Sequence, residues 1–68
     1  MQKVKIHTEY IKLGQFLKWA GVAGSGSDSK SLITEGIIKV NGGIETRRGR
    51  KLRRGDIIEV NERVFEIE

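Results

Sequence analysis

The sequence predicts an α+β domain in which two packed helices lie against a small, mainly antiparallel sheet. Apolar residues recur at helical spacing within residues 13–20, whereas they alternate with polar residues from Ile38 onward. Turn-forming pairs such as Asn41-Gly42 separate the alternating segments. With 68 residues the chain is long enough for one domain and too short for two. We therefore expect residues 1–68 to form a single domain with a thin core.

The first part of the chain predicts a strand and then a helix. Residues 3–7 alternate polar and apolar side chains, which places Val4 and Ile6 on the buried face of a short strand. The helix that follows ends at Gly21, a residue suited to the left-handed backbone of a helix terminus. Its apolar stripe consists of Leu13, Phe16, Leu17 and Ala20. Gly14 lies inside this helix and weakens it by about 1 kcal/mol relative to alanine.

A second, shorter helix is predicted after the flexible segment 21–27. Ser27 is the expected N-cap, and Gly36 is the expected stop. The apolar side chains of this helix are mainly Leu32 and Ile33. Because isolated helices of about two turns are not stable in water, we expect it to pack on the first helix.

The remainder of the chain predicts antiparallel strands. Ile38 and Val40 share a face, and Asn41-Gly42 forms the tight turn of a hairpin whose second strand begins at Ile44 and Glu45. Further strands are expected over residues 57–60 and 64–67, after turns at residues 54–56 and 61–63.

Composition excludes several classes of function. The chain has no cysteine and one histidine, which excludes disulfides and thiolate metal sites and leaves no set of ligands for zinc. The serine- and glycine-rich segment lacks the pattern of a phosphate-binding loop, and the carboxylates are scattered. No apolar run is long enough to span a bilayer, and the N-terminus lacks the apolar stretch of a secretory signal. We therefore expect a cytoplasmic protein that is not an enzyme and needs no metal or cofactor.

A basic segment is the strongest functional signal. Residues 47–54 read RRGRKLRR, with six cations in eight positions, whereas the chain beyond Asp56 is mostly acidic. The net charge is +4. Arginine binds phosphate through both charge and a planar fork of donors, so this polarised charge predicts a polyanionic partner. Leu52 interrupts the run and is expected to anchor the loop in the core, which lowers the cost of ordering it on binding.

Other residues extend this basic segment in the prediction. Lys30 lies in the first turn of the second helix, where free backbone N–H groups also favour anions, and Lys18 can enlarge the basic face. Lys12 is expected to be merely solvated. Trp19 lies beside the apolar stripe, so packing at the edge of the core is favoured over the alternative of stacking on an unpaired base. Tyr10 remains open between the same two roles.

Two runs of the sequence carry a resemblance to a known family. The run IKLGQFLKWAGV is followed, from residue 27, by the patterns L-I-x-x-G-x-I-x-V-N-G, E-x-R-R-G-R-K-L-R-x-G-D and G-D-x-I-x-V. Over about residues 10–60 the chain resembles the RNA-binding domain named after ribosomal protein S-four, also called the alpha-L RNA-binding motif. The arginine-rich pattern is closer still to the small stand-alone bacterial members of the YaaA/YbcJ type, in which the domain is the whole protein.

This resemblance implies binding of structured RNA by the helix pair and the adjoining hairpin loop. Carried over by position, the candidate RNA contacts are Lys18, Lys30, Asn41, Gly42, Arg47, Arg48, Arg50, Lys51 and Arg53. Gly26 stands where many members have an arginine, so the phosphate contact at the entrance to the second helix is altered, and Lys30 is expected to take part of that role. Ser29 stands where members have a small apolar residue, and it should cost some packing between the helices although it keeps the required small size.

The predicted function is non-catalytic binding of structured RNA through the basic loop and the helix pair. By analogy with the family, this RNA is ribosomal RNA during ribosome assembly or quality control, with a ribosomal subunit as a further partner. A monomer is the default expectation for the oligomeric state. The alternative is an adaptor whose basic face docks an acidic protein. Double-stranded DNA ranks lower, because no helix with base-reading side chains is recognisable.

Overall fold

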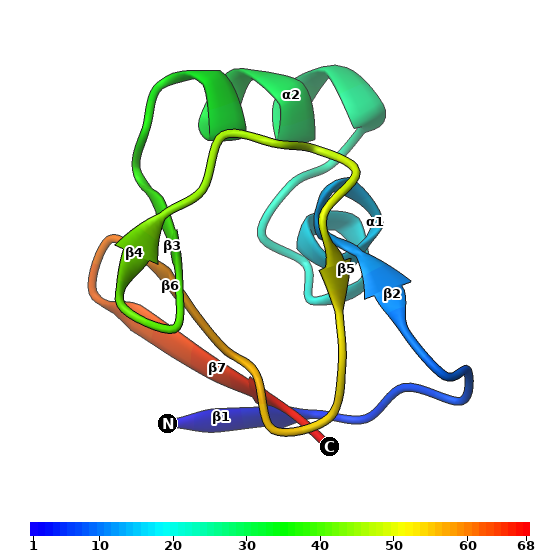
Figure 1. Ribbon diagram of the computed structural model, residues 1–68. Coiled ribbons are helices and arrows are strands. Elements are labelled where there is room, and N and C mark those ends of the chain that lie inside the picture. Colours follow the sequence, from blue (N-terminus) through cyan, green and yellow to red (C-terminus); the bar gives the residue numbers. More distant parts are fainter.

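The computed structural model describes residues 1–68 and contains two helices and seven short strands (Figure 1). In chain order these are β1 (Gln2–Val4), β2 (Ile11–Lys12), α1 (Leu13–Trp19), α2 (Gly26–Thr34), β3 (Ile38–Val40), β4 (Gly43–Ile44), β5 (Lys51–Leu52), β6 (Ile57–Val60) and β7 (Arg63–Ile67). Five strands form one sheet in the order β1-β7-β6-β3-β4, and β2 pairs with β5 in a separate ribbon. Only the β1–β7 pair is parallel. The predicted α+β class with a mainly antiparallel sheet is confirmed.

One hydrophobic core joins the helices to the five-stranded sheet. Phe16 of α1 meets Phe65 of β7 edge to face, with the ring centroids 5.7 Å apart. Val4 and Ile6 are both buried, as the alternation of the first segment predicts. Regular pairing of β1 ends at Val4, before the predicted end at residue 7, although the Ile6 N–H still donates to the Glu68 carbonyl at 3.1 Å.

The start of α2 differs from the prediction. Ser25, not Ser27, is the N-cap, and its Oγ accepts a hydrogen bond from the Asp28 N–H at 3.1 Å. The Asp28 carboxylate in turn accepts from the Gly24 N–H at 3.2 Å. Ser25 is followed three residues later by Asp28, whose carboxylate can accept a hydrogen bond at the helix start. Ser27 is followed at the same spacing by Lys30, which cannot accept one. The helix therefore begins at Gly26.

The predicted turns at residues 41–42 and 54–56 are confirmed by backbone conformation, whereas the turn predicted over residues 61–63 ends one residue earlier, because Arg63 begins β7. Asn41 and Gly42 have φ angles of 52° and 87°, the left-handed pair that a two-residue hairpin requires. Gly55 has a φ of 95°, within the predicted turn between the basic segment and β6. Neither helix has the length and apolarity needed to cross a membrane.

Candidate nucleic-acid interface

The basic segment is fastened to the start of α1 at several points. Leu52 is fully buried, as predicted, and the β2–β5 ribbon pairs it with Ile11. The carbonyl of Arg50 accepts from the Leu13 N–H at 2.8 Å, and that of Arg48 accepts from the Gly14 N–H at 3.0 Å. The first N–H groups of a helix have no partners within the helix, so the loop satisfies them. The loop is thereby held rigidly beside α1.

Two of the arginines are paired with a buried carboxylate. Glu45 is 6% exposed, and its oxygens accept hydrogen bonds from Nε and Nη2 of Arg47, both at 3.0 Å. Nη1 of Arg50 donates to the same carboxylate at 2.9 Å. These bonds, first those from Arg47 and then that from Arg50, hold the pKa of Glu45 far below its ordinary value, and Glu45 raises the pKa of Arg47. Glu45 therefore ties together both ends of the turn at residues 47–50.

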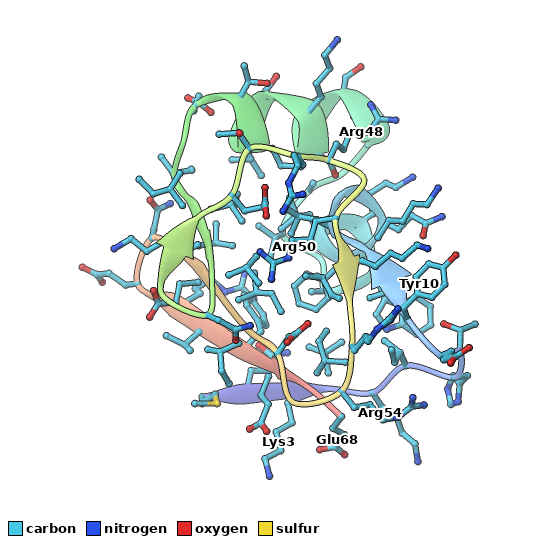
Figure 2. All side chains as sticks on the ribbon, in the orientation of Figure 1. Lys3, Tyr10, Arg48, Arg50, Arg54 and Glu68 are labelled. Carbon is cyan, nitrogen blue, oxygen red and sulfur yellow. The ribbon has the colours of Figure 1, made fainter.

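Arg48 forms no ion pair and lies across α1 instead. A Cβ atom added to Gly14 would lie only 2.6 Å from Cγ of Arg48, so the side chain of Arg48 rests where a larger residue in the helix would stand. Figure 2 shows Arg48 beside α2, whereas Arg50 lies nearer the middle of the molecule. The glycine that weakens α1 thus makes room for the one arginine of residues 47–50 that is free of Glu45.

A polar cleft opens where α1, the start of α2 and the basic segment meet. It has a volume of about 280 Å³ and no apolar residue lines it. Lys12, Lys18 and Arg48 bring three cations to its wall, and Gly26 and Ser29 contribute from α2. None of the three cations is engaged in an ion pair. A concave, cationic hollow of this kind suits a phosphate group.

Ser29 holds the two helices together at the bottom of this cleft. It is buried, and its Oγ donates a hydrogen bond to the Gly14 carbonyl at 3.0 Å. The expectation that serine here weakens the packing of the helices overlooks this bond. A small hydroxyl both fits between the helices and satisfies a carbonyl, so the substitution adds a polar link in place of an apolar contact.

Like charges face each other across the β2–β5 ribbon. Lys12 and Lys51 are directly opposite in the antiparallel register, an arrangement that destabilises a sheet. Nζ of Lys51 lies 4.8 Å from the ring centroid of Tyr10, and the guanidinium of Arg53 lies 5.7 Å from it. Tyr10 therefore gathers two cations over its ring, beside the cleft. This cation–π contact is a third role, distinct from the core packing and the base stacking between which the sequence leaves Tyr10 open.

Comparison with known proteins decides the family. A model of the S4 domain matches residues 4–68. The chain belongs to the S4 domain family. It is 47% identical over 57 residues to the "Probable ribosome maturation protein RlbA" of Bacillus subtilis strain 168, covering 84% of this chain and 80% of that protein. The solution structure of YbcJ from E. coli, described as having an alpha-L motif involved in RNA-binding, has a TM-score of 0.74 at 28% identity and covers 98% of this chain and 86% of YbcJ.

The predicted contacts of this S4 domain fall into separate places. Lys18 and Arg48 line the cleft, and Lys30 shares a neighbouring hollow with Arg48. Lys51 and Arg53 flank Tyr10, whereas Arg47 and Arg50 hold Glu45. Lys12 belongs to the cleft although its sequence context indicated only solvation, because the pairing of β2 with β5 is what brings it there.

Asn41 and Gly42 do not line the cleft and form the turn between β3 and β4. This turn lies away from both helices (Figure 1). The amide of Asn41 is already engaged, since Nδ2 donates to Asp56 at 3.1 Å and Oδ1 accepts from the Ile57 N–H at 2.9 Å. Its bonds fasten the hairpin to β6. RNA contact at this turn stays a prediction.

Trp19 departs from the prediction that it packs at the edge of the core. It is 59% exposed, at the last residue of α1. Its indole N–H donates a hydrogen bond to the Lys5 carbonyl at 3.1 Å. Phe16 and Leu17 fill the available core volume, so the neighbouring tryptophan is left on the surface and is held there by its polar edge.

Proposed function

We propose that this S4 domain binds structured RNA, without catalysing a reaction, through the cleft between the helix pair and the basic segment. The observation that carries the proposal is a set of cations in and around this cleft that have no carboxylate partner. These are Lys12, Lys18, Lys30, Arg48 and Lys51, and none forms an ion pair. Since Lys12 and Lys51 repel each other, an anion between them would relieve a cost that the free protein bears.

RNA suits this surface better than the alternatives. Double-stranded RNA is recognised mainly by the shape and spacing of its phosphates, which a rigid cleft with cations on several elements can follow. Gln15 and Lys18 are the only long side chains that the helix pair contributes to the cleft, fewer than the roughly three or four that a recognition helix places in the major groove of DNA. No observation specifically favours an acidic protein partner.

The relatives support RNA binding and a role in ribosome maturation. RlbA is named as a probable ribosome maturation protein, and YbcJ is described as having an RNA-binding motif. We therefore propose that the RNA is ribosomal RNA, that the domain acts as a monomer on an assembling subunit, and that it does so in the cytoplasm. The whole of residues 1–68 would act as one RNA-binding domain.

Titration of a labelled ribosomal RNA hairpin across a salt series, followed by fluorescence anisotropy, tests the proposal. A DNA duplex of matched length serves as the control. If about five phosphates are contacted, the affinity should fall with a log–log slope of about 4, which is roughly a 250-fold loss between 50 and 200 mM salt. RNA should remain the tighter ligand at every salt concentration.

Equal affinity for RNA and DNA at every salt concentration would contradict the proposal. It would reduce the surface to a non-specific basic patch. A slope near 1 would also contradict it, because the cleft would then engage a single phosphate.

A further inference from the structure

A wide groove continues the cleft along α1 and ends at Trp19. It has a volume of about 880 Å³ and is lined by Tyr10, Ile11 and Trp19 together with Lys12 and Lys18. The two lysines line both the groove and the cleft, so the two hollows form one continuous surface. Glu9 is the only acidic residue that lines the groove, and the cations outnumber it two to one.

Trp19 is the free aromatic surface of this groove. The Tyr10 ring already carries Lys51 and Arg53, whereas no cation lies over the Trp19 ring. The bond from the indole N–H to the Lys5 carbonyl fixes the orientation of a side chain that is otherwise mostly exposed. A large aromatic ring that is held in place loses little conformational entropy when a ligand covers it.

We propose that this groove receives an unpaired nucleotide of the bound RNA, whose base stacks on Trp19 while its flanking phosphates meet Lys12 and Lys18. The inference rests on the proposed function and adds the element of RNA that is recognised. Bases inside a duplex have no free face, so stacking on a protein ring selects a bulge, a loop or an end. Charge complementarity decides the occupant, because the groove combines an aromatic platform with two lysines that lead directly to the phosphate-binding cleft.

The test uses two RNA probes that differ only in an unpaired end. One is a blunt hairpin, and the other is the same hairpin with an overhang of three adenosines. Trp19 is the only tryptophan of the chain, so its intrinsic fluorescence reports directly on stacking. We expect strong quenching by the overhang hairpin and little by the blunt one.

Variants then separate stacking from a merely structural role. Because Trp19→Ala removes the ring on which a base would stack, it should lower the affinity for the overhang hairpin by about tenfold and leave the affinity for the blunt hairpin unchanged. Trp19→Phe should retain most of the binding. Ile44→Ala is the matched control, because Ile44 is 65% exposed and lies on β4, on the other side of the molecule from β2 (Figure 1).

Each outcome bears on a different claim. If wild type and Trp19→Ala bind both hairpins equally well, the nucleotide site is overturned and RNA binding by the cleft stands. If Trp19→Ala and Trp19→Phe lose both hairpins to the same extent, Trp19 supports the fold only and the nucleotide site is likewise overturned. Quenching by a poly-glutamate peptide but not by the overhang hairpin would assign the groove to an acidic protein instead. Failure of wild type to bind either hairpin would overturn the proposed function itself.

Discussion

Arg47 and Arg48 are neighbours in the chain, yet the fold gives them different surroundings. The side chain of Arg47 is 73% exposed, but its Nε and Nη2 groups already donate hydrogen bonds to Glu45. Arg48 lies across Gly14 with no carboxylate beside it and faces the cleft. Both residues are exposed, so exposure alone does not separate them as RNA ligands, whereas the pairing of charges ranks Arg48 first.

This difference shows that one buried carboxylate divides the basic segment into two classes. Glu45 holds Arg47 and Arg50, and the other cations of the segment have no carboxylate partner. Glu45 neutralises much of the charge of Arg47 and Arg50, and it fixes the shape of the loop in return. The cations outside its reach keep their full charge for a ligand. A loop of six free cations would repel itself and would be costly to order, so the carboxylate makes the binding cations usable.

Glu45→Gln should produce the largest loss of stability, since it removes the carboxylate charge that holds Arg47 and Arg50. Charge-assisted hydrogen bonds to a buried carboxylate are lost, but the Arg47 side chain is largely exposed, so we expect a loss of about 1 kcal/mol in the free energy of unfolding, measured by urea denaturation. Arg47 and Arg50 would be released to bind phosphate, so the salt dependence of RNA binding should become steeper. An unchanged urea midpoint would show that the carboxylate does not hold the loop.

The same variant should change the response to acid. The pKa of Glu45 is lowered from 4.5 in the folded protein, so an unfolded chain takes up the proton first as the pH falls. The stabilisation that the Glu45 carboxylate provides is complete above about pH 5. It begins to decline below about pH 4.5 and keeps declining as the pH falls toward the pKa of Glu45 in the folded protein. The difference in stability between wild type and Glu45→Gln should therefore narrow between about pH 5 and pH 3, and a constant difference would contradict this role.

Arg48→Gln and Arg47→Gln compare the two classes directly. Glutamine keeps part of the side-chain stem and removes the charge. We expect Arg48→Gln to lower RNA affinity about tenfold and to reduce the salt slope by about 0.8, as loss of one phosphate contact predicts. Arg47→Gln should lower affinity less than threefold. Equal losses in anisotropy titrations would show that Glu45 does not withdraw Arg47 from RNA.

Lys12→Gln should give the smallest change in stability, and it should stabilise the domain, whereas Glu45→Gln destabilises it. Removing the repulsion with Lys51 should stabilise the free domain by about 0.3 kcal/mol in urea denaturation. RNA affinity should nevertheless fall a few-fold, because Lys12 lines the cleft. Lys39→Gln, on the exposed side of β3, is the matched control and should leave RNA affinity unchanged. Loss of stability without loss of affinity would remove Lys12 from the binding surface.

Much of the fold could be predicted because its signals are local. The alternation of Ile38 and Val40, the Asn41-Gly42 turn and the burial of Leu52 all follow from side chains within a few residues of one another. The predicted N-cap of α2 lies two residues too late, since two serines compete and the decision depends on the position of Asp28. The β2–β5 ribbon could not be predicted because two-residue strands carry no periodicity.

By itself the sequence determined the α+β class, the basic segment and the family, because periodicity, charge density and motif spacing are properties of the chain. Only the tertiary structure decided which cations are free, since a hydrogen bond to Glu45 depends on how the loop folds back on itself. It also decided that Lys12 reaches the cleft and that Trp19 stays exposed, because both depend on segments far apart in sequence and on how much core volume other side chains fill. Charge and aromatic content can be counted along a chain, but their availability to a ligand is settled by packing.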